Sequence, residues 1–160
     1  MLLSNPFDRV SRLLIEDPVL SKITTFRQTS PNAPEAGGVL LGFRRNAHLH
    51  ISMATSPGPG DRGSAYRFFR DDESHARIAL LEWSRSMETM DYLGEWHTHP
   101  ESHPQPSHLD MREWLNICGR RRAPMIFIIQ GTISCWVGLG IGRAVKMAEL
   151  VYDEAPQPST

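Results

Sequence analysis

The chain has 160 residues, and its 17 lysines and arginines nearly balance 18 aspartates and glutamates. With 40% hydrophobic residues, this length suffices for one domain with a sizeable core, which excludes wholesale disorder. The net charge of −1 argues against nucleic acid as a partner, because phosphate-binding domains carry a basic excess. Two cysteines cannot build a disulfide framework or a cysteine-rich zinc finger, so imidazole and carboxylate groups would have to bind any transition metal.

Targeting and membrane-spanning segments are not expected. The N-terminal residues lack a basic stretch followed by an apolar one, and no apolar run approaches the roughly 20 residues that cross a bilayer. We therefore expect a cytoplasmic protein without membrane contact. Residues 1–153 are expected to form a single domain, and the Pro-rich residues 154–160 a flexible tail.

In chain order, residues 10–15 fit either a strand or a helix. Asp17 and Pro18 then predict the N-cap and first turn of a short helix that ends near Phe26. Continuous or alternating apolar patterns predict strands over residues 37–43, 48–53, 92–98, 125–129, 133–139 and 145–151. Prolines and glycines predict loops over residues 28–34 and 56–63.

Helical spacing of apolar residues predicts two more helices, over residues 71–90 and 107–118. The residues expected to face the core are Ile78, Leu81, Met87 and Met90 in the first helix and Met111, Trp114, Leu115 and Cys118 in the second. Strands interspersed with three helices indicate a mixed α/β sheet with helices on its faces.

A cluster of histidines carries the chemical signal. Because side chains alternate along a strand, His97 and His99 are expected on one face, where they can share a cation. Ser107 and Asp110 have the spacing of a helix N-terminus, so Asp110 could be a third ligand. Two histidines and one carboxylate leave one position of a tetrahedral zinc open for water, which is typical of catalytic sites. Fe(II) is the alternative metal, but the remaining residues fit zinc hydrolysis better.

Such a site needs a general base that does not bind the metal. Glu35 is the candidate, because it immediately precedes the buried strand predicted over residues 37–43. Sequence spacing alone does not bring Glu35 to His97, and that step depends on the fold.

Five residues in this order resemble the JAMM motif of the JAB/MPN metalloprotease family: Glu35, His97, His99, Ser107 and Asp110. The segment Glu35-Ala-Gly-Gly-Val-Leu-Leu-Gly42 is similar to the glutamate-bearing strand of the family, and the resemblance runs from about Pro34 to Leu139. It implies an α/β fold of the JAB/MPN (cytidine-deaminase-like) type, with a mixed, mostly antiparallel sheet and about three helices.

The same resemblance implies the roles of the site residues. His97, His99 and Asp110 would hold one Zn²⁺ per chain, with a catalytic water in the open position. Glu35 would take a proton from this water and pass it to the leaving amine. Ser107 would stabilise the oxyanion, which needs a donor aimed where charge develops.

Residues 54–62 and 93–101 narrow the resemblance to small bacterial JAB proteases of CBASS antiphage operons. Those enzymes are encoded beside an E1/E2-like conjugating protein and remove a CD-NTase from targets joined to its C-terminus. A zinc-dependent isopeptidase or peptidase for a ubiquitin-like or CD-NTase-type conjugate is therefore implied. The extended C-terminal tail of its substrate would pair with an exposed sheet edge, and loop 56–63 could close over it.

Other functions fit parts of the pattern. A JAMM protease of a sulfur-carrier or other ubiquitin-like pathway would use the same residues. A non-catalytic MPN binding module would hold a partner on the same sheet, although the intact motif weighs against it. A nucleobase deaminase would need a Pro-Cys-x-x-Cys ligand pair, which the sequence lacks.

Other notable residues have simpler interpretations. His48 and His50 repeat the His-x-His pattern without a following carboxylate, so we expect exposed strand residues. His75 is expected to face solvent near a helix start, and Trp96 to pack in the core. Glu101 fits a plain surface charge better than a partner of the metal ligands. Both cysteines are expected to be unreactive core residues.

Overall fold

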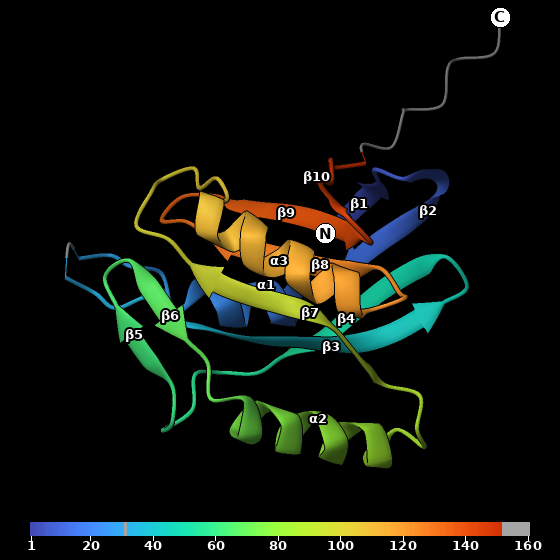
Figure 1. The fold of residues 1–160 in the computed structure, drawn as a ribbon, viewed down its shortest axis with the longest axis horizontal. Coiled ribbons are helices and arrows are strands. Elements are labelled where there is room, and N and C mark those ends of the chain that lie inside the picture. Colours follow the sequence, from blue (N-terminus) through green and yellow to red (C-terminus); the bar gives the residue numbers. More distant parts are fainter. Residues whose placement is uncertain (31, 152–160) are drawn as a thin grey trace, which may run out of the picture.

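The computed structural model describes residues 1–30 and 32–151. Three helices are interspersed among the strands along the chain (Figure 1). The elements are β1 (Leu2–Asn5), β2 (Asp8–Ile15), α1 (Asp17–Thr24), β3 (Gly37–Arg45), β4 (His48–Ala54), β5 (Arg62–Ser64), β6 (Arg67–Phe69), α2 (Asp72–Arg85), β7 (Asp91–Thr98), α3 (His108–Arg120), β8 (Met125–Gln130), β9 (Cys135–Ile141) and β10 (Ala144–Met147). The predicted tail over residues 154–160 lies outside the described residues.

One sheet of eight strands organises the molecule, in the order β1-β2-β4-β3-β7-β8-β9-β10. The pairs β2–β4 and β7–β8 are parallel, and the other neighbours are antiparallel. The sheet curls until its two ends meet, because Leu3 bridges Leu150 and the Ser4 N–H donates to the Glu149 carbonyl at 2.8 Å. The mixed, mostly antiparallel sheet with three helices confirms the expected fold class.

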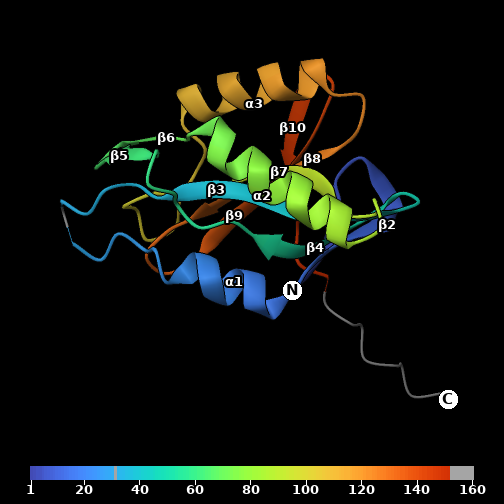
Figure 2. The same ribbon diagram turned by 90° about the horizontal axis from the view of Figure 1, so that it is seen from below.

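Both faces of the sheet are covered. Helix α1 lies on one side and α3 on the other, with α2 running along the α3 side (Figure 2). Because β8 is covered on both faces, its residues 125–129 are all apolar. Ile126 and Ile128 pack in the cluster beneath α1, whereas Met125, Phe127 and Ile129 pack with α3. Burial of each such side chain stabilises the fold by roughly 1.5–3 kcal/mol.

The structure decides one open alternative and shifts several predicted boundaries. Residues 10–15 belong to strand β2, and the N-cap of α1 is Glu16 rather than Asp17. Helix α1 ends at Thr24, before the predicted Phe26. The predicted strands over residues 133–139 and 145–151 are observed as β9 and the shorter β10.

Helix α2 departs most from its prediction. It ends at Arg85 rather than near Met90, because Met87 and Glu88 adopt positive φ angles of 54° and 65° that no right-handed helix allows. Leu81 and Met87, expected in the core, are 48% and 86% exposed. The apolar stripe of this helix is therefore largely unburied.

Three short strands have no counterpart in the predictions. Strand β1 at the N-terminus extends the sheet, and β5 and β6 form a separate hairpin, residues 62–69. The hairpin begins in the loop predicted over residues 56–63. Its strands have three residues each and are largely exposed, so they show no apolar alternation that could reveal them.

Among the described residues, no helix is both long and apolar enough to span a membrane.

Candidate active site

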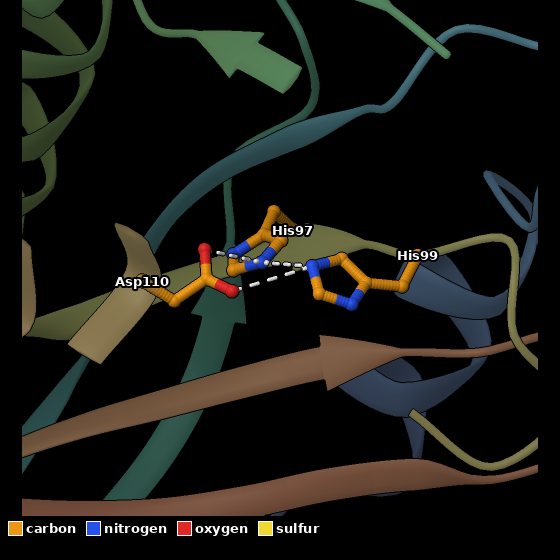
Figure 3. A group of neighbouring side chains, drawn as sticks. All are labelled: His97, His99 and Asp110. Carbon is orange, nitrogen blue, oxygen red and sulfur yellow. Dashed lines mark hydrogen bonds and ion pairs between the residues drawn. The ribbon is translucent and has the colours of Figure 1, made fainter. Parts of the chain in front are cut away.

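Strand β7 and the residue after it place the imidazoles of His97 and His99 on the side of the sheet that α3 covers. Trp96 packs in the cluster on the α1 side, and His97 projects the opposite way, with its ring 5.9 Å from that of Trp114 on α3. His99 follows directly after the strand and lies on the same side as His97. The two Nε2 atoms are 3.0 Å apart, so the rings face each other across the site (Figure 3).

Helix α3 supplies the carboxylate. Ser107 caps the helix in a capping box: its Oγ accepts the Asp110 N–H at 3.1 Å, and its own N–H donates to Asp110 Oδ2 at 2.7 Å. This reciprocal pair orients the Asp110 carboxylate toward the imidazoles. Oδ1 lies 3.3 Å from His97 Nε2, and Oδ2 lies 3.5 Å from His99 Nε2 (Figure 3).

The electrostatics favour a neutral His97 and an ionised Asp110. Burial lowers the pKa of His97 to about 4 despite the nearby Asp110 charge. Burial would raise the pKa of Asp110, but hydrogen bonds and charge from the histidines and Ser107 lower it to about 2. Burial likewise opposes a charge on His99, yet its hydrogen bond and attraction to Asp110 and the charges of Glu35 and Glu101 raise its pKa overall.

These three side chains fit a metal ion. Their donor atoms all lie within 4.8 Å of one another, and the set of two imidazoles and one carboxylate is one that zinc prefers. Two ring nitrogens at 3.0 Å can share one proton between them, or both can direct lone pairs at one cation. The structure thus brings together a His-His-Asp group of the kind that the sequence predicts.

Glu35 reaches the same site from the segment just before strand β3. Gly37 of β3 is paired with His97 of β7, and the two strands are antiparallel. Glu35, two residues before Gly37, therefore lies just beyond the end of β7, on the side of His99. The Glu35 side chain is buried, and this burial, with the charges of Asp110 and Glu101, raises its pKa to about 7 despite attraction to His99. A carboxyl group with a pKa near neutrality is suited to taking up and releasing protons.

The β5–β6 hairpin holds Glu35 from the opposite side. The Glu35 N–H donates to the Ser64 carbonyl at 2.7 Å, and the Phe68 backbone lies near enough to the Glu35 carboxyl group to favour its ionised form. Both contacts come from residues that sequence reasoning missed. No local pattern identifies them, because they are backbone groups of a short exposed hairpin.

All five predicted site residues line one open cleft of about 470 Å³. The hairpin forms one wall, with Arg67, Phe68 and Phe69, and α3 forms another. Arg67 and Glu113 lie 3.9 Å apart and link these walls. Ser107 Oγ accepts a hydrogen bond from Asp110, which leaves its hydroxyl proton as a donor for the cleft.

Several secondary expectations are settled by the geometry. Trp96 is buried in the core as predicted. Glu101 is 59% exposed at its side chain, but its Oε2 lies 3.3 Å from His99 Nδ1, so it is more than a plain surface charge. His75 was expected to face solvent, and this is wrong: it is only 2% exposed and has polar partners on both ring nitrogens.

The second His-x-His pair differs from the first. His48 Nδ1 accepts the Arg12 N–H at 3.0 Å, and His50 Nε2 lies 2.7 Å from Glu16. Each imidazole has its own partner, so the two do not converge. Burial raises the pKa of the Cys118 thiol to about 11, in agreement with an unreactive core cysteine.

Comparison with protein families matches residues 16–142 to prokaryotic homologs of the JAB domain. The chain belongs to this JAB family. The match covers the cleft and every strand and helix that contributes to it. The JAB domain therefore provides the framework on which the His-His-Asp group and Glu35 are placed.

Three curated relatives of this JAB chain carry the name CD-NTase/cGAS isopeptidase. The relative from Pseudomonas aeruginosa is 41% identical over 74% of this chain and 78% of its own length. The relative from Escherichia coli is 34% identical over 85% of this chain and 86% of its own length. The relative from Vibrio cholerae is 36% identical over 79% of this chain and 80% of its own length. The solution structure of a protein from Desulfitobacterium hafniense has a TM-score of 0.63 at 19% identity, over 89% of this chain and 94% of its own, and supports the fold.

Proposed function

We propose that this chain is a zinc-dependent isopeptidase that removes a CD-NTase-type or ubiquitin-like protein from conjugates formed through its C-terminus. The placement of Glu35 beside His97, His99 and Asp110 in one open cleft carries the proposal. The shared name of the three relatives supports the substrate class. We take residues 1–153 as one JAB domain.

His97, His99 and Asp110 are proposed to hold one Zn²⁺ ion, which when bound would supply Lewis acidity toward a catalytic water and the scissile carbonyl. Glu35 accepts a proton from the attacking water. The water oxygen bonds to the carbonyl carbon, the carbon–nitrogen bond breaks, and Glu35 returns the proton to the leaving lysine amine. A pKa near 7 lets this carboxyl group serve in both steps.

Ser107 acts on the carbonyl oxygen. Ser107 lines the cleft and its Oγ accepts the Asp110 N–H, so its hydroxyl proton is available to donate to the oxygen as negative charge develops. The capping box holds Ser107 and Asp110 in one rigid turn, so the oxyanion donor and a metal ligand keep a constant separation. Such preorganisation avoids a reorganisation cost during the reaction.

The hairpin is proposed to guide the substrate tail. Three consecutive residues of its second strand line the cleft, so an extended tail can lie alongside β6 and reach the metal site. Main-chain hydrogen bonds to a strand edge would supply affinity with little dependence on sequence. An E1/E2-like enzyme of an antiphage (CBASS) system would supply the conjugate.

The test is direct hydrolysis of a defined conjugate. A bacterial CD-NTase joined through its C-terminal carboxylate to a lysine of a carrier protein is incubated with the purified chain, and the products are read by mass spectrometry. The proposal predicts release of the intact CD-NTase with a free C-terminal carboxylate, and no release after chelation. Binding without cleavage would instead indicate a non-catalytic module, and cleavage of a sulfur-carrier conjugate alone would indicate the other pathway.

A further inference from the structure

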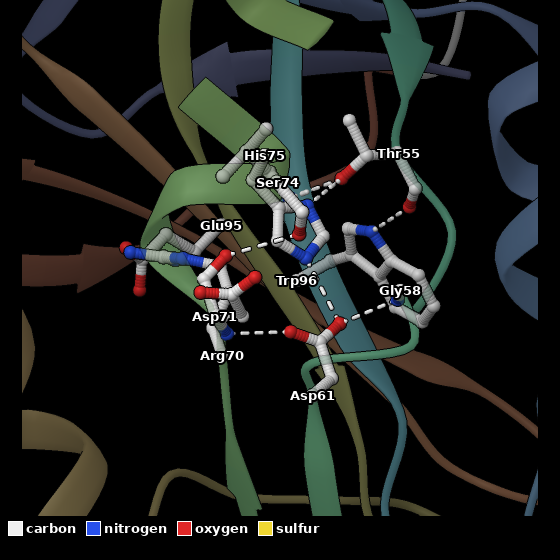
Figure 4. A network of polar contacts seen from close by, with 10 residues as sticks. Thr55, Gly58, Asp61, Arg70, Asp71, Ser74, His75, Glu95 and Trp96 are labelled. Atoms are coloured by element: carbon white, nitrogen blue, oxygen red, sulfur yellow. Dashed lines mark hydrogen bonds and ion pairs between the residues drawn. The ribbon is translucent and has the colours of Figure 1, made fainter. Parts of the chain in front are cut away.

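A second group of polar side chains is buried behind the hairpin, away from the proposed metal site. His75 at the start of α2 is hydrogen-bonded through both ring nitrogens (Figure 4). Its Nδ1 lies 2.6 Å from Thr55 Oγ1, and its Nε2 lies 2.9 Å from Asp61 Oδ2. We refer to Thr55, His75 and Asp61 as the anchor triad.

The anchor triad has the composition of a hydroxyl–imidazole–carboxylate catalytic group, but it is sealed. Thr55 is 1% exposed and His75 2% exposed, and the Asp61 side chain is 3% exposed. A substrate cannot reach the Thr55 hydroxyl, which also accepts the Val39 N–H at 2.9 Å. Because no substrate can reach the triad, a catalytic role is excluded. Its role must lie in the parts of the chain that it joins.

Asp61 holds both ends of the hairpin. It immediately precedes β5, and its Oδ1 accepts the N–H of Asp71, two residues after β6, at 2.5 Å. Its Oδ2 also accepts the Gly58 N–H at 2.7 Å (Figure 4). Burial opposes ionisation of Asp61, but these hydrogen bonds and that of His75 keep its pKa below the usual value. One carboxylate thus clamps the base of the hairpin.

Thr55 connects this clamp to the sheet that carries the two proposed histidine ligands. It exchanges backbone and side-chain hydrogen bonds with Val39 of β3, and its carbonyl accepts the Trp96 Nε1–H at 3.0 Å. Trp96 directly precedes His97. The imidazole of His75 is therefore a bridge between the base of the hairpin and strands β3 and β7.

The far end of the hairpin reaches the proposed general base. The Ser64 carbonyl accepts the Glu35 N–H at 2.7 Å, and the Phe68 backbone lies near the Glu35 carboxyl group. A path of hydrogen bonds and covalent chain therefore runs from the sheet through the anchor triad and the hairpin to Glu35. Displacement of the hairpin would release these two contacts and one wall of the cleft together.

We propose that Thr55, His75 and Asp61 are positioning residues that set the hairpin over the cleft, and through it the substrate tail and Glu35. The proposal rests on the function proposed above, because it assigns this buried group to the same reaction. Displacement of reacting groups by about 1 Å can cost on the order of 100-fold in rate.

The test compares Thr55→Val, which removes the hydroxyl at nearly constant shape, with Thr55→Ser, which keeps it. The proposal predicts that Thr55→Val lowers kcat/KM for conjugate cleavage about 10- to 100-fold, with a higher KM as the tail loses its wall. Amide hydrogen exchange over residues 62–69 and at Glu35 should accelerate, while zinc content stays at that of the unaltered chain. Thr55→Ser should restore kcat/KM and amide protection.

Equal kcat/KM and equal hairpin protection in the two variants would overturn the proposal, as would an activity loss that follows only the folded fraction or the zinc content. If Thr55→Val does not fold, Asp61→Asn carries the test with the same readouts, because it removes the charge but keeps the shape. Failure of the unaltered chain to cleave any conjugate would refute the proposed function. The exchange comparison would then still decide whether the triad positions the hairpin.

Discussion

Two groups of imidazole and carboxylate side chains lie close to the same hairpin, and they satisfy their polar atoms in opposite ways. In the anchor triad, each nitrogen of His75 faces one partner, and the Asp61 carboxylate is filled by hydrogen-bond donors. In the His-His-Asp group, the Nε2 atoms of His97 and His99 face each other and a carboxylate. The acceptor atoms of the His-His-Asp group converge on one point, where a cation can bind. In the anchor triad, each acceptor already has a donor, so the triad is a complete structural network.

Exposure strengthens the contrast. The anchor triad is sealed, and the His-His-Asp group opens into a cleft beside a buried carboxyl group, Glu35. Chemical composition alone would treat the two groups as similar. The difference lies in access and in unpaired lone pairs, and each of the following experiments acts on one side of that difference.

The largest effect is expected from removal of a proposed metal ligand. Asp110→Ala should lose zinc and reduce cleavage to background, because two imidazoles alone hold the ion too weakly. Zinc is measured by elemental analysis and cleavage by mass spectrometry. His50→Ala is the matched control, since His50 pairs with Glu16 outside the cleft, and it should keep both zinc and activity.

Substitution of the proposed general base should separate catalysis from metal binding. Glu35→Gln keeps shape but cannot accept the proton, so cleavage should fall about 10²- to 10⁴-fold while zinc content stays unchanged. Stopped assays on zinc-loaded protein measure this difference. Full activity in Glu35→Gln would show that another group moves the proton.

Zinc affinity should weaken as the pH falls below neutrality. The raised pKa of His99 means that this imidazole carries a proton at higher pH than usual, and zinc must displace that proton. Affinity should therefore fall by up to about tenfold per pH unit below the His99 pKa and level off above it. Because the pKa of Asp110 is lowered, protonation of Asp110 weakens zinc binding only at far more acidic pH. Competition with a chelator across pH measures the slope, and a flat profile would contradict a zinc-binding His99.

In the anchor triad, removal of the imidazole should lower the stability of the fold without changing the zinc content. His75→Ala removes one buried hydrogen bond from Thr55 and one from Asp61 and leaves a cavity, so the free energy of unfolding should fall by about 2–4 kcal/mol. Denaturant unfolding measures this change. Loss of zinc from folded His75→Ala protein would contradict the assignment of His75 to a structural group separate from the His-His-Asp group.

The smallest effect is expected at Glu101. Its carboxylate contacts His99 Nδ1 but is largely exposed, so solvent screens the interaction. Glu101→Gln should change zinc affinity less than about tenfold, as measured by the same chelator competition. A larger loss would make Glu101 an essential partner of His99.

Local patterns in the sequence place part of the site correctly. Strand alternation puts His97 and His99 on one face, and the Ser107–Asp110 spacing marks the turn that aims the third side chain. Both are short-range consequences of backbone geometry. The approach of Glu35 depends on the register of β3 against β7, which links residues about 60 positions apart, and only the family resemblance indicated it.

The anchor triad could not be predicted, because its members share no local period. His75 occupies an early turn of a helix whose other faces are mostly exposed, so solvent exposure was the reasonable expectation. Its partner Asp61 lies in a loop rich in Gly and Pro, and the hairpin that follows has strands too short to show a pattern. Burial here results from tertiary packing of loop, hairpin and helix.

Titration of the metal-free chain with Zn²⁺ tests the central claim most directly. Chelated protein receives increasing zinc, and cleavage of the CD-NTase conjugate is followed at each step. The account predicts that activity rises linearly and stops rising at one zinc per chain, with Asp110→Ala inactive throughout. Activity that is independent of zinc, or full activity in Asp110→Ala, would contradict it.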